Sequence, residues 1–387
     1  MKCNFTMTQG HSNNINGANR LIIRIKCAKP DFLFASKMIR ANFRFFTVII
    51  HLIPVMLKSS LIFSLILLIS GQLAAQLVTP ESERIGQLNL QGGLPPKLLS
   101  TRTAGFYHHT ISDKELAEVQ LAFQRAGIDA IIYFELDKPF ASKDVSKAFS
   151  DYLTKREITN LVFIEKSDDG YRITITPFSG KEDIMSPGQS AWSTSNRLLT
   201  EALRTLGRTT SSGQKKENLL INDAPETDAV INPILGKRNE FYATDLTVDL
   251  LAVPKTGDEA IDRELEEIFK NNYTLKFKMT EPGIVEKELR RQGHLYIMTF
   301  VYSRGSVARE LLGYDMTKSE SAYLSVTYSD GKQQLKNIPS NTPVFKFYFK
   351  HIDSGNVFLG TKWDADMTWQ QALINHIVGM KTELRLN

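Results

Sequence analysis

The chain has 387 residues, with 47 lysines and arginines against 42 aspartates and glutamates, which gives a formal net charge of +5. Its two cysteines, Cys3 and Cys27, both lie near the N-terminus. A disulfide framework, a thiol nucleophile and a cysteine-ligated zinc are therefore excluded for the rest of the chain. The length is enough for about two domains, which can bury adequate cores without disulfides.

Residues 56–76, MLKSSLIFSLILLISGQLAAQ, have the order of a secretory signal peptide: a short charged start, an apolar run and a small-residue end. We therefore expect export, with Met56 as the initiator, cleavage at the end of this segment and residues 1–55 as an untranslated basic leader. An uncleaved anchor is the alternative. Lys58 argues against it, because the clean apolar run that follows is shorter than the ~20 residues that span a bilayer.

The excess of positive charge belongs to the segment that ends with this signal. Removing residues 1–76 takes away nine basic residues and one acidic residue, which leaves 38 basic against 41 acidic residues, a net charge of −3. This balance does not favour a nucleic-acid partner, which requires a clustered basic face. We expect no cofactor and no stable membrane span after signal cleavage. The expected partners are proteins of the cell envelope, and a homo-oligomer is compatible with the sequence.

Residues 77–104 hold tandem glycines and tandem prolines, and they predict an extended, loosely held lead-in. An α/β domain is expected over residues 105–208. It begins with a capping box, in which Ser112 and Glu115 satisfy free amides at the start of a helix that Gly127 ends. The later elements are a strand at 128–136, a helix around 145–153, a hairpin of 161–166 with 171–177, and a helix of 198–206 ended by Gly207.

Residues 209–238 are polar and rich in turn formers, which predicts a linker or a loop lying over the first domain. A second α/β domain is expected over residues 239–387, with Thr280 as the N-cap of one helix. Its expected strands are 245–253, 273–278, 294–302, 321–328, 343–350 and 356–360, and its expected helices are 258–270, 283–292, 306–312 and 369–384. The predicted fold is therefore α+β (mixed α and β), with two domains that each pack helices on a mixed sheet.

Two segments of the chain echo each other. Residues 162–175 and 347–360 each read as strand, Lys, acidic-Gly turn and strand, and each leads through a tryptophan to a helix. An internal duplication of a hairpin-plus-helix unit would produce this pattern. Coincidence is the alternative, because Asp-x-Gly turns and buried tryptophans are common.

His108 and His109 precede a helix whose first turn carries Asp113 and Glu115. Imidazole and carboxylate groups are ligands that zinc prefers, so His108, His109 and Asp113 are a candidate metal site, with Glu115 as a further member. The alternative is a solvated turn in which the two acids are favoured by the helix dipole. A metal-assisted hydrolase would follow from the first reading.

Arg304, Gly305 and Ser306 lie between a strong strand and a short helix, so they are a candidate anion site. The alternative is an ordinary turn with Ser306 as N-cap. A third candidate is the strand of residues 343–350, whose Lys346, Tyr348 and Lys350 alternate with phenylalanines. An exposed edge at that strand could pair with a partner strand.

Three further features have a functional and a structural interpretation. Asp364 and Asp366 form an Asp-x-Asp pair that could hold calcium, or else cap the last helix. Trp363 and Trp369 could stack on sugar rings, or else anchor the core. Ser329 and Lys332 have the spacing of a Ser-Lys nucleophile, but they fall at a hairpin turn, where that chemistry is not expected.

The chain has no G-x-S-x-G, H-E-x-x-H, P-loop or G-x-G-x-x-G motif. We therefore expect an exported protein, periplasmic or associated with the outer envelope, that binds or scaffolds other proteins without catalysis. A metal-assisted hydrolase with a site near His108 and His109 is the first alternative, and a carbohydrate-binding module is the second.

Overall fold

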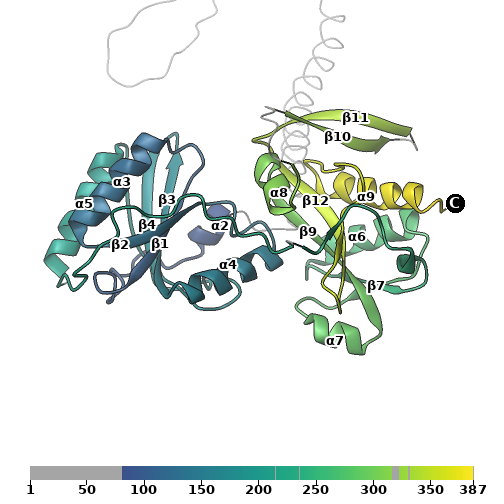
Figure 1. The fold of residues 1–387 in the computed structure, drawn as a ribbon, viewed down its shortest axis with the longest axis horizontal. Helices are drawn as coiled ribbons and strands as arrows, with labels where there is room; N and C mark the ends of the chain where they lie inside the picture. The colour runs from purple at the N-terminus through teal and green to yellow at the C-terminus, as the bar shows by residue number, and fades with distance from the viewer. Residues whose placement is uncertain (1–80, 214, 235, 316–321, 330–331, 387) are drawn as a thin grey trace, which may run out of the picture. The chain divides into compact units, whose positions relative to one another are not determined.

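The computed structural model describes residues 81–387, except 214, 235, 316–321, 330–331 and 387. The expected leader and signal peptide lie outside the described residues. Those that are described belong to one compact unit and form three sheets, of five, six and two strands, with helices packed on them (Figure 1). The predicted α+β class is confirmed, whereas the division into two domains stays a prediction.

The five-stranded sheet has the order β2-β1-β3-β4-β5. Its strands are β1 (Arg102–Tyr107), β2 (Asp129–Glu135), β3 (Ile158–Ser167), β4 (Gly170–Pro177) and β5 (Trp192–Asn196). β1 runs parallel to β2 and β3, and β4 runs antiparallel to β3 and β5. The parallel strands are covered on both faces, which explains why their sequences are almost continuously apolar.

Helices cover both faces of this sheet. α3 (Asp113–Ala126) and α5 (Leu199–Gly213) lie side by side on one face, and α4 (Lys143–Lys155) lies on the other (Figure 1). Each face of the sheet has a hydrophobic core, and strand β3 contributes side chains to both because they alternate between the faces. Val162 and Ile164 face α3 and α5, while Phe163 faces α4. The predicted capping box of α3 is confirmed, with Ser112 and Glu115 each accepting from the other's backbone amide.

The six-stranded sheet has the order β6-β13-β12-β9-β7-β8. Its strands are β6 (Arg238–Asn239), β7 (Leu250–Pro254), β8 (Phe277–Thr280), β9 (His294–Arg304), β12 (Pro343–His351) and β13 (Val357–Phe358). A 3-10 turn, η1 (Thr244–Thr247), precedes β7. The helices of this half are α6 (Glu259–Asn272), α7 (Glu286–Arg291), α8 (Gly305–Leu311) and α9 (Trp369–Glu383).

The two large sheets share one topology. The order and directions of β2-β1-β3-β4-β5 are repeated by β8-β7-β9-β12-β13, and the paired helices α3 and α5 correspond to α6 and α9. An internal duplication predicts this agreement, and the duplication itself stays a prediction. The alignment suggested by the sequence echo is one strand out of step, because it matches the β3–β4 hairpin with β12–β13 instead of with β9 and β12.

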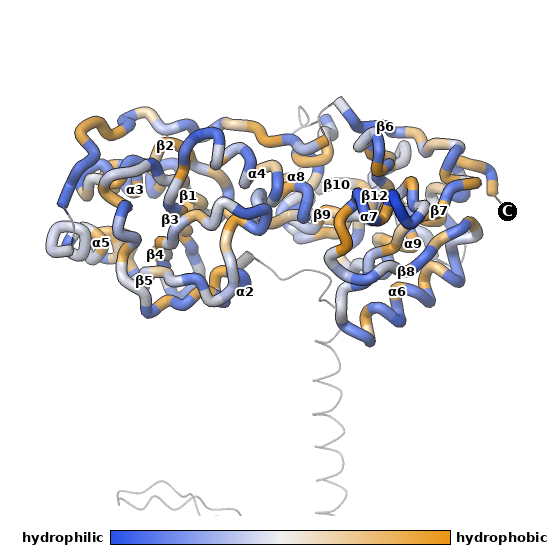
Figure 2. Tube along the Cα trace, turned by 90° about the horizontal axis from the view of Figure 1, so that it is seen from below, coloured by the Kyte–Doolittle hydropathy of each residue, from blue (hydrophilic) through white to orange (hydrophobic). Residues whose placement is uncertain are grey.

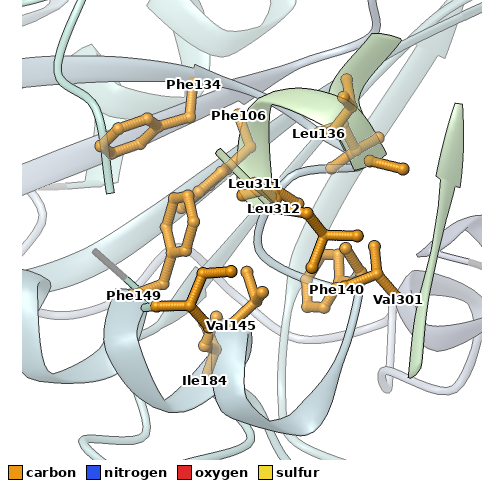
Figure 3. Close-up of a cluster of buried hydrophobic side chains, with 14 of the residues drawn as sticks. Phe106, Phe134, Leu136, Phe140, Val145, Phe149, Ile184, Val301, Leu311 and Leu312 are labelled. Carbon is orange, nitrogen blue, oxygen red and sulfur yellow. The ribbon is translucent and has the colours of Figure 1, made fainter. Parts of the chain in front are cut away.

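One hydrophobic core joins the two halves of the unit. Figure 3 shows Phe140 and Phe149 from the first half in one cluster with Val301, Leu311 and Leu312 from the second, and Phe140 is drawn beside Val301. Backbone and side-chain bonds support the same junction: the Tyr302 amide donates to the Ala141 carbonyl at 2.8 Å. Because apolar side chains from both sheets share this core, the loss of one half would expose apolar surface on the other.

The lead-in of residues 77–104 differs from the expectation. Its described part begins with α2 (Glu81–Gly86), β1 begins at Arg102 within it, and Ile85 and Leu98 are completely buried. The tandem Gly-Gly and Pro-Pro pairs therefore interrupt the regular secondary structure of this segment, but they do not prevent its side chains from packing. Residues 89–92 also hydrogen-bond to residues 189–191 beside β5.

The expected linker also begins later than predicted, because α5 runs through Gly207 to Gly213. Its later part lies along the outer edge of β2, where Glu226 donates its amide to the Ile131 carbonyl and accepts from the Tyr133 amide. This part of the chain is a loop along the first sheet, which is one of the two alternatives that the sequence left open. It covers a sheet edge that would otherwise be open to other strands.

One other local prediction is wrong, and one strand was not predicted. Thr280 is the last residue of β8 and does not cap a helix, since α7 begins only at Glu286. No strand was predicted for residues 332–339, where β11 (Lys332–Pro339) lies. Across the part of the chain that is described, no helix combines the length and apolarity needed to cross a bilayer.

Candidate functional site

A two-stranded hairpin is inserted between β9 and β12, where the corresponding strands β3 and β4 are joined by a tight turn. Its strands are β10 (Ala322–Ser329) and β11 (Lys332–Pro339), and they pair antiparallel (Figure 1). Since the shared topology is complete without this hairpin, the fold does not require it. The hairpin is therefore a candidate for a functional element of the second half.

The inner strand of the hairpin, β10, is held in place by hydrogen bonds and by packing. The Val326 amide donates to the Trp363 carbonyl at 2.8 Å, and the Ser325 hydroxyl donates to the Ala365 carbonyl. Tyr323 and Ile338 enter the core shared by both halves, and β10 packs against α9. The hairpin is thus held in a defined position, and that rigidity lowers the entropic cost of binding to it.

The outer strand, β11, is an open sheet edge. Its outer side pairs with no other strand of the described residues, so every second residue directs its backbone N–H and C=O away from β10. β11 has eight residues, whereas the edge strands β6 and β8 of the large sheet have two and four. Natural proteins usually keep such edges short or cover them, so a long open edge is a candidate pairing site.

Two leucines add apolar contact area beside this edge. Leu324 is 61% exposed and Leu335 is 63% exposed. They share one face of the ribbon as diagonal neighbours, because Leu324 lies opposite Asn337 and Leu335 lies opposite Val326. An incoming strand would gain both backbone hydrogen bonds and apolar contacts at this position.

Three lysines lie on or beside the hairpin. Lys332 begins β11, Lys362 donates to Gln333 at 2.6 Å, and Lys336 forms an ion pair with Asp366 at 2.9 Å. Of these lysines, only Lys336 has a carboxylate partner among the described residues. Lysines on an edge discourage pairing with another positive strand and favour an acidic one.

The strand that the sequence singled out as the partner strand is in the wrong place for that role. β12 lies inside the six-stranded sheet between β9 and β13, and Lys346 and Tyr348 are buried. Lys350 bridges Asp144 at 3.0 Å and Glu286 at 2.8 Å. The alternation of Lys and Tyr with Phe does not mark a wet face here, because both faces of β12 are covered.

Lys346 belongs to a buried polar cluster with Asp364, His376 and Tyr242. Its Nζ lies 2.7 Å from Asp364 Oδ1 and donates to the Leu359 carbonyl at 2.7 Å. His376 Nδ1 lies 3.2 Å from Asp364 Oδ2 and 3.0 Å from the Tyr242 hydroxyl. A lysine, an acid and an imidazole at these distances resemble catalytic groups, but both Lys346 and His376 are completely buried.

Within this cluster, Lys346 and Asp364 form an internal ion pair. Burial, together with the nearby Lys346 charge, lowers the pKa of His376 to about 4. Burial alone would raise the pKa of Asp364, but Lys346 and His376 outweigh it and the pKa is lowered. His376 is therefore neutral and Asp364 is ionised at neutral pH. A small pocket of about 120 Å³ lies beside Asp364, and it does not expose the lysine.

The expected metal site is not assembled. His108 and His109 stack on each other with ring centroids 4.3 Å apart, and His108 Nδ1 lies 2.8 Å from the Thr110 hydroxyl. Glu115 is held by Lys166, Tyr171 and Ser112 instead of facing the imidazoles. Partial burial would raise its pKa, but these hydrogen bonds lower the pKa to about 2.

Asp113 does not complete the site either. Within the described ranges, no three histidine, cysteine or carboxylate side chains converge as metal ligands. The pKa of His108 is lowered, mainly by burial and then by His109, and burial also lowers the pKa of His109. Both imidazoles are therefore mostly neutral at pH 7, and they stack on each other just beyond β1, with His109 exposed.

The expected anion site at Arg304, Gly305 and Ser306 is wrong for a physical reason. The Arg304 guanidinium already binds Asp137 at two points and also pairs with Glu135. The Gly305 amide donates to the Thr342 carbonyl and the Ser306 amide donates to the Ser340 carbonyl. The donors that an anion would need are therefore used within the protein.

The remaining candidates are also used internally. Asp364 pairs with Lys346 and Asp366 pairs with Lys336, so neither carboxylate is left for calcium. Trp369 is completely buried and Trp363 is almost so, packed by Tyr314, Tyr323 and Arg309. Their rings cannot stack on a sugar. Ser329 and Lys332 pair across the end of the hairpin, as the turn prediction required.

Sequence reasoning missed the hairpin edge because its outer strand, KQQLKNIP, is mostly polar. Only Leu335 within that run, and Leu324 in the strand before it, give a hint of an exposed apolar pair. Comparison with known protein families, with characterised proteins and with solved structures finds no match for this chain.

Proposed function

We propose that the protein is an exported, non-enzymatic binding protein of the cell envelope, which captures an extended segment of a partner protein along β11. The observation that carries this proposal is the eight-residue open edge of β11, with Leu324 and Leu335 exposed beside it. Main-chain hydrogen bonds would supply affinity, and the two leucines would supply selectivity for apolar side chains at alternate positions.

The charge near the edge indicates the kind of segment. Lys332 and Lys362 have no carboxylate within 4 Å among the described residues, so acidic side chains next to the apolar positions would find partners there. A second copy of β11 would bring its own lysines to the same place. An acidic, alternating strand from another protein is therefore the better match.

The catalytic alternatives have less support. The groups with suitable chemistry, at Arg304, Lys346 and Glu115, are each neutralised by internal partners. The hydrolase alternative needs His108, His109 and Asp113 to converge on a metal, and the carbohydrate alternative needs the rings of Trp363 and Trp369 to be exposed. Neither arrangement is present in the described part of the chain.

The test places a negative charge at one or the other of the two exposed leucines of the hairpin. The variants Leu335→Glu and Leu324→Glu are expressed in the producing cells as the full chain, treated with a cleavable cross-linker and purified. We expect the wild type to retain a discrete partner and each variant to lose most of it, with unchanged melting temperatures because both side chains are exposed.

The matched control is Leu219→Glu, because Leu219 is a leucine of even greater exposure, at 94%, away from the hairpin. This variant should retain the partner in full. If Leu219→Glu lost the partner as well, or if both hairpin variants kept it, binding would not depend on β11.

A further inference from the structure

The helices α3 and α5 leave a groove between them on the outer side of the first sheet. The groove has a volume of about 690 Å³. The two helices that line it run side by side (Figures 1 and 2). Residues 118–126 of α3 and 200–211 of α5 line it, each at the three-and-four spacing of one helix face. At 1.5 Å per residue these stripes are about 12 Å and about 16 Å long, the length of two to three helical turns.

The groove has an apolar floor and a positive rim. Leu121, which is 46% exposed, and the half-buried Ala122 provide apolar surface above the buried Leu203, while Arg125, Arg204 and Arg208 line the sides together with one carboxylate, Glu118. Arg204 pairs with Glu201. No carboxylate of the described residues lies within 4 Å of Arg125 or Arg208, so both cations are available to a partner.

Gly207 is a second and independent observation. It lies inside α5, where glycine is destabilising relative to alanine, and a Cβ added to it would meet no atom within 4 Å. Its backbone angles are not of the left-handed kind that require glycine. The fold therefore gives no reason for a glycine here, whereas close approach of another chain to the floor of the groove does.

We propose that this groove binds an amphipathic α-helix of a partner protein, with its apolar stripe on Leu121 and Ala122 and acidic residues facing Arg125 and Arg208. A helix is the occupant because an apolar stripe between two parallel ridges of side chains matches a third helix. A second copy of the same surface is disfavoured, because it would place arginines opposite arginines. The site is separate from β11 and goes beyond the edge-strand function.

The experiment uses two fluorescent 16-residue helical peptides that share one leucine–alanine stripe. One peptide carries glutamates on both sides of the stripe, and the other carries lysines. Binding to the full chain is measured by fluorescence anisotropy at two salt concentrations. We expect the acidic peptide to bind at least tenfold more tightly than the basic one, with affinity that falls as salt rises.

Variants locate the site. Gly207→Leu fills the floor of the groove and should weaken the binding of the acidic peptide at least tenfold. The double variant Arg125→Glu with Arg208→Glu should make the basic peptide bind more tightly than the acidic one. Gly213→Leu is the matched control, since Gly213 is on the same helix, also has open space at its Cβ, and does not line the groove. It should bind the acidic peptide as the wild type does.

Three results would overturn the proposal: no binding of the acidic peptide at millimolar concentration, equal binding of both peptides, or binding that Gly207→Leu leaves intact. Sedimentation of the full chain that revealed a dimer broken by Gly207→Leu would assign the groove to a second copy instead. None of these results depends on Leu324 or Leu335, so failure here is distinguishable from failure of the β11 proposal.

Discussion

Arg304 and Asp137 form a two-point ion pair between residues 167 positions apart in the sequence, with Nε 2.7 Å from Oδ2 and a terminal nitrogen 3.1 Å from Oδ1. The Ser303 hydroxyl donates to the same carboxylate, and Glu135 pairs with the same guanidinium. Both main partners are largely buried. The pair therefore joins the end of β9 to the end of β2, beside the core that the two halves share.

Removing one member of this pair should be costly. Arg304→Met leaves two carboxylates poorly compensated, so we expect the free energy of unfolding to fall by roughly 3 to 5 kcal/mol, measured by urea denaturation. Asp137→Asn should cost less, because an amide can still accept from Arg304. In a double-mutant cycle the two effects should be non-additive by about 1 kcal/mol or more. Simple additivity would mean that the pair does not couple the two halves.

The buried imidazole of His376 predicts a specific dependence on pH. Its pKa is lowered to about 4 in the folded protein, whereas the unfolded chain protonates near the ordinary value of 6.5. Protonation thus favours the unfolded state as the pH falls from about 6.5 to about 4. The contribution of this group to stability should drop by roughly 3 kcal/mol across that window.

The measurement is urea denaturation at several pH values between 7 and 4. His376→Gln should flatten the profile in this window by about one proton, relative to the wild type. Tyr242→Phe keeps the imidazole and removes only the hydroxyl 3.0 Å from it, so it should retain the slope. An identical slope in His376→Gln and the wild type would contradict the assigned pKa.

Gly207 offers a prediction about stability alone. Since a methyl group at this position meets open space within a helix, Gly207→Ala should raise the free energy of unfolding by about 0.5 to 1 kcal/mol. Thermal or urea denaturation would measure the change. A destabilised variant would mean that glycine is required by the fold here, and the argument from this residue for a bound helix would be lost.

Export makes a prediction about mass. If residues 56–76 are a cleaved signal, the protein recovered from the soluble envelope fraction should begin near Gln76 or Leu77, as intact-mass spectrometry can establish. A protein that retains Met56 and sediments with membranes would instead be an anchored one. The β11 edge would then act at a membrane surface.

Features decided by short stretches of chain were predictable from the sequence. The capping box at Ser112 and Glu115 depends on four consecutive residues, and it forms as predicted. The location of β12 was not predictable in the same way. Whether Lys346 faces water depends on β13 and β9 beside it and on Asp364, which lies 18 residues further along. Alternation of polar and apolar residues gives the two faces of a strand, but not which of them is covered.

The candidate binding edge was hidden for a related reason. A polar strand such as β11 has little hydrophobic periodicity. That it is an open sheet edge is known only once the positions of the neighbouring strands are known. The same holds for Arg304: its position after a strand suggested an anion site, and only the fold revealed that Asp137 and Glu135 already occupy it. Partners distant in sequence decide both cases.

The most direct test of partner capture at β11 is site-specific photo-cross-linking in the producing cells. A benzoylphenylalanine replaces Leu335 in the full chain, and in the control it replaces Glu267, an exposed residue on α6. We expect position 335 to give one discrete cross-linked protein that position 267 does not give. No adduct at 335, or the same adducts at both positions, would contradict the proposal that β11 is a partner-binding edge.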